Sequence, residues 1–74
     1  MSKLILASGK ETVKKFEKIG YRVVRQTGSH IRMRHFTDKS KNPLTIPNHP
    51  VIGRGLLRKI LRDADITVEE FNNL

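Results

Sequence analysis

Apolar residues recur at helical spacing in the first third of the chain. Val13, Phe16 and Ile19 lie three residues apart and would share one face of a helix. Ser8 and Glu11 have the spacing of a capping box, and Gly20 can end the helix in a left-handed conformation. The pattern therefore predicts a helix over residues 9–19. Residues 1–7 are expected to be a loose start or a short edge segment.

The last third of the chain repeats this helical pattern. A second helix is predicted from residue 54 or 55 to residue 64, and its apolar stripe consists of Leu56, Leu57, Ile60, Leu61 and Ala64. Thr67 and Glu70 then repeat the capping-box spacing. They predict a short final helix that buries Val68, Phe71 and Leu74.

The middle of the chain has the period of β-strands. Residues 21–26 and 29–36 are predicted to be strands joined by a tight turn at Thr27-Gly28, because glycine takes a positive φ without strain. Residues 44–46 predict a third strand, which Pro47 ends. Between the second and third strands, residues 37–43 read as a polar loop.

Alternation within the second strand assigns its side chains to two faces. If Ile31 and Met33 face the core, then the opposite face carries His30, Arg32 and Arg34. His35 has the parity of the core side. In the first strand, Val24 is out of phase with its apolar neighbours, so one apolar side chain is left for the far face.

These elements predict an α+β fold with the order α-β-β-β-α. Two helices would cover one face of a three-stranded antiparallel sheet, and the other face would remain open. We expect one domain over residues 1–74, with a helical extension at 67–74.

Charge is the most informative feature of the composition. The formal net charge is +8, and the segment from Lys18 to Arg62 holds eleven Lys and Arg but one acidic residue, Asp38. A cationic surface of this kind attracts polyanions by releasing their condensed counterions. The distribution predicts binding to nucleic acid.

Cysteine is absent, which excludes disulfides, thiolate metal sites and thiol nucleophiles and favours a reducing, cytoplasmic location. The longest apolar stretch is too short to span a bilayer, so no membrane association is expected. His30, His35 and His49 do not have the spacing of a compact zinc site. We therefore expect neither a metal nor another cofactor.

Gly28-Ser29-His30 is the constellation best suited to chemistry on RNA. The ribose 2′-hydroxyl is a built-in nucleophile, and an imidazole, with a reference pKa near neutrality, can serve either proton transfer. Arg32 and Arg34 would extend from His30 in a row with about 7 Å between successive members, and Arg22 could lie across from them. From the residues alone, a histidine at the start of an outward strand face is more often a solvated polar residue than a catalytic one. His49 could close a turn or contact phosphate.

Three ordered segments resemble the HicA-type mRNA interferase toxins. They are residues 20–30, ending in Gly28-Ser29-His30; residues 44–50, Leu-Thr-Ile-Pro-Asn-His-Pro; and residues 54–62, a basic amphipathic helix. The resemblance covers a core at about residues 8–66. It implies a double-stranded-RNA-binding-like fold, metal-independent endoribonuclease activity on mRNA, and inhibition by a HicB-type antitoxin. It also implies that His30 is the catalytic histidine and Gly28 the family's glycine. The chain departs from many members at Ile31, where they have a second histidine.

Three functional hypotheses follow. The first is an RNA endonuclease toxin in which His30 is the general acid or base. The predicted RNA-binding residues are Arg22, Arg25, Arg32, Arg34, His49, Arg54 and Arg58. The second is a non-catalytic module that docks on structured RNA. The third is an interaction subunit whose cationic face serves an acidic antitoxin.

Overall fold

The computed structural model describes residues 3–74, which form three helices and one sheet. Along the chain these are α1 (Gly9–Glu17), β1 (Tyr21–Thr27), β2 (His30–His35), β3 (Leu44–Pro47), α2 (Arg54–Ala64) and α3 (Val68–Asn72). The strands pair antiparallel in the order β1-β2-β3. The predicted α+β fold and its α-β-β-β-α order are confirmed.

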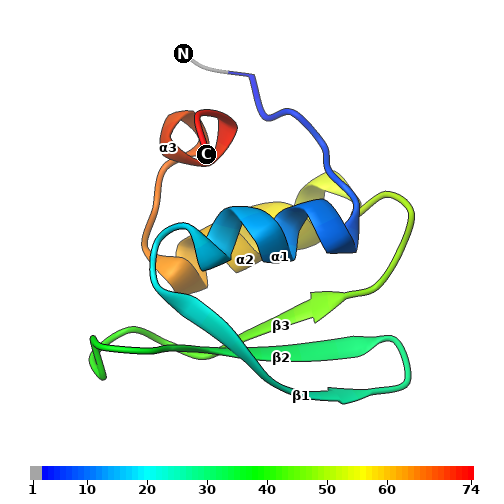
Figure 1. The fold of residues 1–74 in the computed structure, drawn as a ribbon. Coiled ribbons are helices and arrows are strands. Elements are labelled where there is room, and N and C mark those ends of the chain that lie inside the picture. The colour runs from blue at the N-terminus through cyan, green and yellow to red at the C-terminus, as the bar shows by residue number, and fades with distance from the viewer. Residues whose placement is uncertain (1–2) are drawn as a thin grey trace.

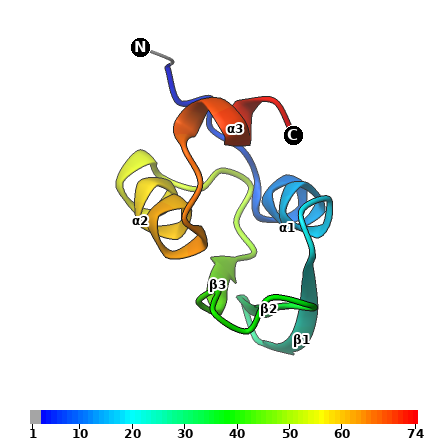
Figure 2. The same cartoon turned by 90° about the vertical axis from the view of Figure 1, so that its left-hand side faces the viewer.

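The helices lie on one side of the sheet (Figure 1). Figure 2 shows α1 over the β1 side and α2 over the β3 side, with α3 beyond them both. No helix of the described residues covers the opposite face, which we call the open face. Along residues 3–74, none of the helices has the length and apolar character needed to cross a membrane.

Both predicted capping boxes are present. Glu11 N donates to Ser8 Oγ at 3.0 Å, and Ser8 N donates to a Glu11 carboxylate oxygen at 2.9 Å. Thr67 and Glu70 repeat the arrangement at the start of α3. The backbone N–H groups of Ser8 and Thr67 hold the pKa of Glu11 and of Glu70 below the ordinary value, because they stabilise the charged carboxylates.

Helix α1 ends at Glu17, two residues before the predicted end. The chain continues in a tighter turn, in which Ile19 N donates to Phe16 O at 3.1 Å and Gly20 N donates to Glu17 O at 3.3 Å. Gly20 then takes a φ of 103°, which turns the chain into β1. The apolar pattern predicted a longer α-helix than the structure contains, because the tighter turn after α1 still directs Ile19 towards the core.

Aromatic rings join the sheet to the helices in the core. Phe16 of α1 packs edge-on against Tyr21 of β1 at 5.7 Å and contacts Phe71 of α3 at 5.8 Å between ring centroids. Ile31 and Met33 are buried as predicted. In α2, Leu56 departs from the predicted stripe and is 43% exposed, because the other four apolar residues of α2 already cover the sheet side.

The N-terminal segment is hydrogen-bonded to the final helix, α3. Residues 3–7 form no strand, yet Leu4 and Ala7 are buried, and Ile52 N donates to Ala7 O at 2.9 Å. The Asn72 side chain binds the backbone of Lys3 and Ile5 at 2.8 and 3.2 Å. Residues 3–7 are therefore not the loose start that was one of the two expectations for this segment. The part of that prediction on residues 1–2 lies outside the described residues.

The burial of Tyr21 in the core can be tested by titrating its hydroxyl group. Tyr21 is the only tyrosine, its side chain is fully buried, and its hydroxyl donates to Asn42 O at 2.9 Å. Burial, with Asp38 and Asp63 adding to it, raises the pKa of Tyr21 above the ordinary 10.0. Ultraviolet titration of the folded protein should therefore show one phenolate transition above that of the guanidinium-unfolded chain.

The sign of the linked stability change follows from this raised pKa. The folded state binds the phenolic proton more tightly, so the stabilisation is complete below the unfolded pKa and is lost as pH rises through the folded one. A folded-state transition at or below the unfolded one would contradict the packing of Tyr21.

Candidate active site on the open sheet face

A two-residue turn positions His30 at the start of the central strand. Thr27 pairs with His30, so the loop consists of Gly28 and Ser29, one residue later than the predicted Thr27-Gly28 turn. Gly28 has a φ of 59°, as the first loop residue of a type II′ hairpin requires. A Cβ there would meet nothing within 4 Å, so the backbone conformation and not crowding favours glycine.

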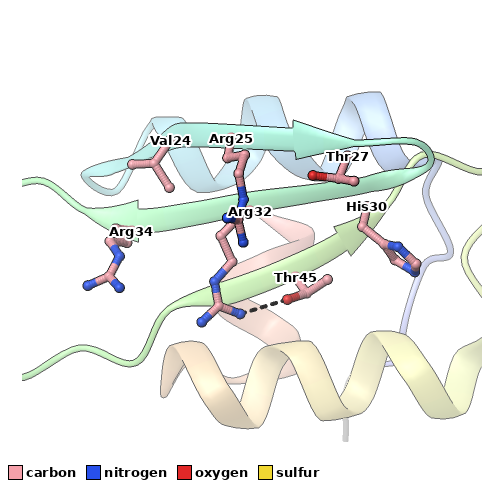
Figure 3. A pocket seen from close by; sticks show the side chains of 7 residues that line it. All are labelled: Val24, Arg25, Thr27, His30, Arg32, Arg34 and Thr45. Atoms are coloured by element: carbon pink, nitrogen blue, oxygen red, sulfur yellow. Dashed lines mark hydrogen bonds between the residues drawn. The ribbon is translucent and has the colours of Figure 1, made fainter.

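His30 is exposed on the open face, between Thr27 of β1 and Pro47 of β3. It lines a hollow of about 750 Å³, shown in Figure 3, together with Val24, Arg25, Thr27, Arg32, Arg34 and Thr45. The predicted alternation of β2 is confirmed, since Ile31 and Met33 are buried beneath the more exposed Arg32 and Arg34. The hollow therefore combines one imidazole with three guanidinium groups.

A β-bulge brings Arg25 to this hollow. The register shifts between Val23, which pairs with Met33, and Arg25, which pairs with Arg32, so Val24 is an extra residue. In a regular strand Arg22 and Arg25 would point to opposite faces. The extra residue reverses that parity and places Arg25 directly beside Arg32 on the open face (Figure 3).

Arg32 is held in place from β3. One guanidinium nitrogen donates to Thr45 Oγ1 at 2.8 Å, which orients the planar group across the hollow (Figure 3). The other guanidinium N–H groups can bind phosphate oxygens. Thr45 was not among the residues predicted for the site. The alternation of Leu44-Thr45-Ile46, with Leu44 and Ile46 buried, is the signal that could have identified it.

Arg22 lies across from Arg34 in the register, as predicted, but its guanidinium is directed away from His30. It donates to Glu17 O at 3.1 Å and Tyr21 O at 2.7 Å, and it lies 5.8 Å from the Phe36 ring. Arg22 lines a second hollow, of about 340 Å³, which Arg34, Lys39 and Lys41 also line. Arg34 therefore connects the two cationic areas.

Two other predicted RNA-binding residues lie outside the His30 hollow. Arg54 is exposed at the first residue of α2. Arg58 lines a small hollow with Arg62, Ile66 and Val68, between α2 and the start of α3. Neither arginine lines the two hollows that contain His30.

His35 stabilises the fold, and its side chain lies on the core side of β2, as the alternation of this strand predicted. Its Nε2 lies 2.8 Å from Ile19 O, and its Nδ1 accepts from Asp38 N at 2.9 Å, which assigns the Nε2–H tautomer. Its ring packs edge-on against Tyr21 at 5.1 Å. Both nitrogens are therefore engaged in holding the end of α1 and the loop after β2.

His49 and His30 both line a third hollow, a groove between β3 and α2. The groove has a volume of about 340 Å³ and shares His30, Arg32 and Thr45 with the hollow of the open face. Its other lining residues are Pro43, Pro47, His49, Leu56, Lys59, Ile60 and Asp63. Of these, Lys59 and Asp63 form an ion pair at 3.0 Å. His30 thus stands at the junction of the basic hollow and the groove.

Among the residues that line the hollow of the open face and the groove, one is acidic, Asp63, and it is paired with Lys59. Asp38 lies in the loop after β2, where hydrogen bonds from Ser40 hold the pKa of its carboxyl below the ordinary value. Glu69 and Glu70 belong to α3, on the side of the molecule away from the open face (Figure 1). The charge distribution therefore favours a polyanion at the open face.

A model of the HicA toxin of bacterial toxin–antitoxin systems matches residues 9–66. The matched segment begins with α1, contains all three strands and the hairpin that presents His30, and ends two residues after α2. A comparison with curated proteins found no match.

Proposed function

The chain belongs to the HicA toxin family of bacterial toxin–antitoxin systems, and from this we propose that it is a metal-independent endoribonuclease that cleaves mRNA with His30. The observation that carries the proposal is the exposed position of His30 at the junction of the two hollows, among Arg25, Arg32 and Arg34. We further propose that a HicB-type antitoxin neutralises this toxin by covering the open face.

The reaction uses a nucleophile that RNA itself contains. The 2′-oxygen attacks the adjacent phosphorus, a bond from O2′ to phosphorus forms, and the bond from phosphorus to O5′ breaks. One proton must leave the 2′-oxygen and one must reach the departing 5′-oxygen. The products are a 2′,3′-cyclic phosphate and a 5′-hydroxyl, and His30 can mediate one of these proton transfers.

The arginines supply the electrostatic part of the proposed mechanism. Negative charge develops on the phosphoryl oxygens in the transition state, and fixed positive groups stabilise it without reorganising. Arg32 suits this role because Thr45 holds it. Arg25 lies opposite Arg32, and Arg34 extends the row for a neighbouring phosphate. Arg54 and Arg58 would meet only RNA that extends beyond the sheet.

A labelled transcript incubated with antitoxin-free protein in EDTA tests the proposal. We expect discrete fragments whose 3′ ends carry a cyclic phosphate, because the 2′-oxygen and not water attacks. Gel electrophoresis before and after removal of the cyclic phosphate would show this end group. An intact transcript with shifted mobility would instead favour the non-catalytic RNA-binding module, which the cationic open face alone would explain.

A further inference from the structure

Cleavage by the 2′-oxygen requires two proton-transfer groups on different sides of the phosphate. The attacking and departing oxygens lie roughly in line through phosphorus. A base beside the 2′-oxygen is therefore poorly placed to protonate the 5′-oxygen in the same step. With His30 on one side of the phosphate, a second group must face it across the bound RNA.

Few groups of the described residues can serve as that partner. The two nitrogens of His35 are engaged with Ile19 O and Asp38 N. The hydroxyl of Tyr21 is buried and bound to Asn42 O. Within the groove, Lys59 and Asp63 are paired with each other at 3.0 Å, and an arginine does not release its proton near neutral pH. His49 is the remaining groove residue with a suitable side chain.

Backbone contacts place His49 near the end of β3 that pairs with His30. Pro47 is the register partner of His30, and His49 follows two residues later, within about 7 Å of chain. Asn48 N donates to Ser29 O at 2.7 Å, which fastens this segment to the hairpin. Gly9 N donates to His49 O at 2.9 Å, which fastens it to α1. Both contacts use backbone atoms and leave the exposed imidazole of His49 unbound within residues 3–74. His49 lines both the groove and a smaller hollow with Ser8, Lys10, Asn48 and Pro50.

We propose that His49 is the general acid of the reaction and His30 the general base. This assignment rests on the proposed ribonuclease function. Neutral His30 accepts the proton of the 2′-hydroxyl as O2′ bonds to phosphorus. Protonated His49 donates its proton to O5′ as the bond from phosphorus to O5′ breaks. Arg32, which lines both hollows, contacts the phosphoryl oxygens between them.

A substrate with sulfur at the leaving position tests His49 directly. The wild-type cleavage site is first mapped and placed in a short RNA whose scissile 5′-oxygen is replaced by sulfur. A thiolate departs without a proton, so it removes the need for a general acid. Single-turnover rates are then measured on the oxygen and sulfur substrates for the wild type, His49→Ala and His30→Ala.

With oxygen, His49→Ala should be about 10²- to 10⁴-fold slower than the wild type. With sulfur, it should recover to within about tenfold, while His30→Ala should stay slow on both substrates. A loss of binding or of structure would lower both rates of His49→Ala equally and would overturn the assignment. Rates of His49→Ala equal to the wild type on oxygen, or rescue of His30→Ala instead, would also overturn it.

Folding is checked separately with His49→Gln, which keeps a polar side chain and the backbone contacts. Its melting temperature should match the wild type, and its rates should follow those of His49→Ala. Failure of the wild-type protein to cut either substrate would contradict the ribonuclease function itself. Wild-type cleavage without the sulfur rescue would contradict only the role of His49.

Discussion

Replacing His30 with alanine is expected to lower the rate of RNA cleavage by about 10²- to 10⁴-fold, the usual loss when a general acid or base is removed. In cells, induced wild-type protein should arrest growth and degrade mRNA, and His30→Ala should do neither. The physical reason is that the substituted site keeps Arg25 and Arg32 to bind phosphate but has no imidazole at the junction of the hollows. The cleavage rate and the growth curve measure the two effects.

The same variant separates catalysis from binding. His30 is exposed, so its removal should change the free energy of unfolding by no more than about 0.5 kcal/mol, and RNA affinity should be largely retained. Arg62→Ala is the control, because Arg62 is exposed on the α3 side of α2, and it should remain active. Undiminished cleavage and toxicity in His30→Ala would remove this histidine from the mechanism.

Replacing Gly9 with alanine is expected to destabilise the fold by about 3 kcal/mol, the upper end of the usual cost of overpacking. A Cβ at Gly9 would overlap the carbonyl oxygen of Pro47 and lie 2.9 Å from the Cα of Asn48. These are backbone atoms, so no side-chain rotation relieves the clash. For a domain of this size, the melting temperature should fall by roughly 12–24 °C.

Gly55→Ala is the matched control for this effect. Gly55 lies in α2, and a Cβ there would meet nothing within 4 Å, so alanine should stabilise the protein by about 0.5–1 kcal/mol. Gly9 is the first residue of α1 and Gly55 the second residue of α2, and of the two only Gly9 closely approaches the end of β3. Equal melting temperatures for Gly9→Ala and the wild type would show that α1 does not pack closely on Pro47.

Local patterns in the sequence were sufficient to predict most of the elements. The capping boxes of Ser8 and Thr67 marked the starts of α1 and α3 correctly. Alternation in β2 placed His30 and Arg32 opposite the buried Ile31 and Met33. These features depend on residues within one or two turns, or on neighbours along one strand, so the sequence alone expresses them.

The positions of side chains that depend on contacts with other elements were harder to predict from the sequence. Arg22 was expected near the His30 row, but the carbonyl of Glu17 attracts its guanidinium to the end of α1. Leu56 was expected in the core and instead lines the groove. Arg58 has the positive charge that RNA binding requires, but it lies near the start of α3. Charge and hydropathy predicted a basic, amphipathic chain without saying which side chains converge.

Local periodicity and composition were enough to predict the order of elements, the cationic middle of the chain and the outward direction of His30. The tertiary structure decided which groups surround that histidine. The bulge at Val24 brings Arg25 beside Arg32, and the bonds from Asn48 to Ser29 and from Gly9 to His49 bring a second imidazole into the groove. Strand register and backbone contacts between distant segments are properties of the packed chain, and no local window of sequence contains them.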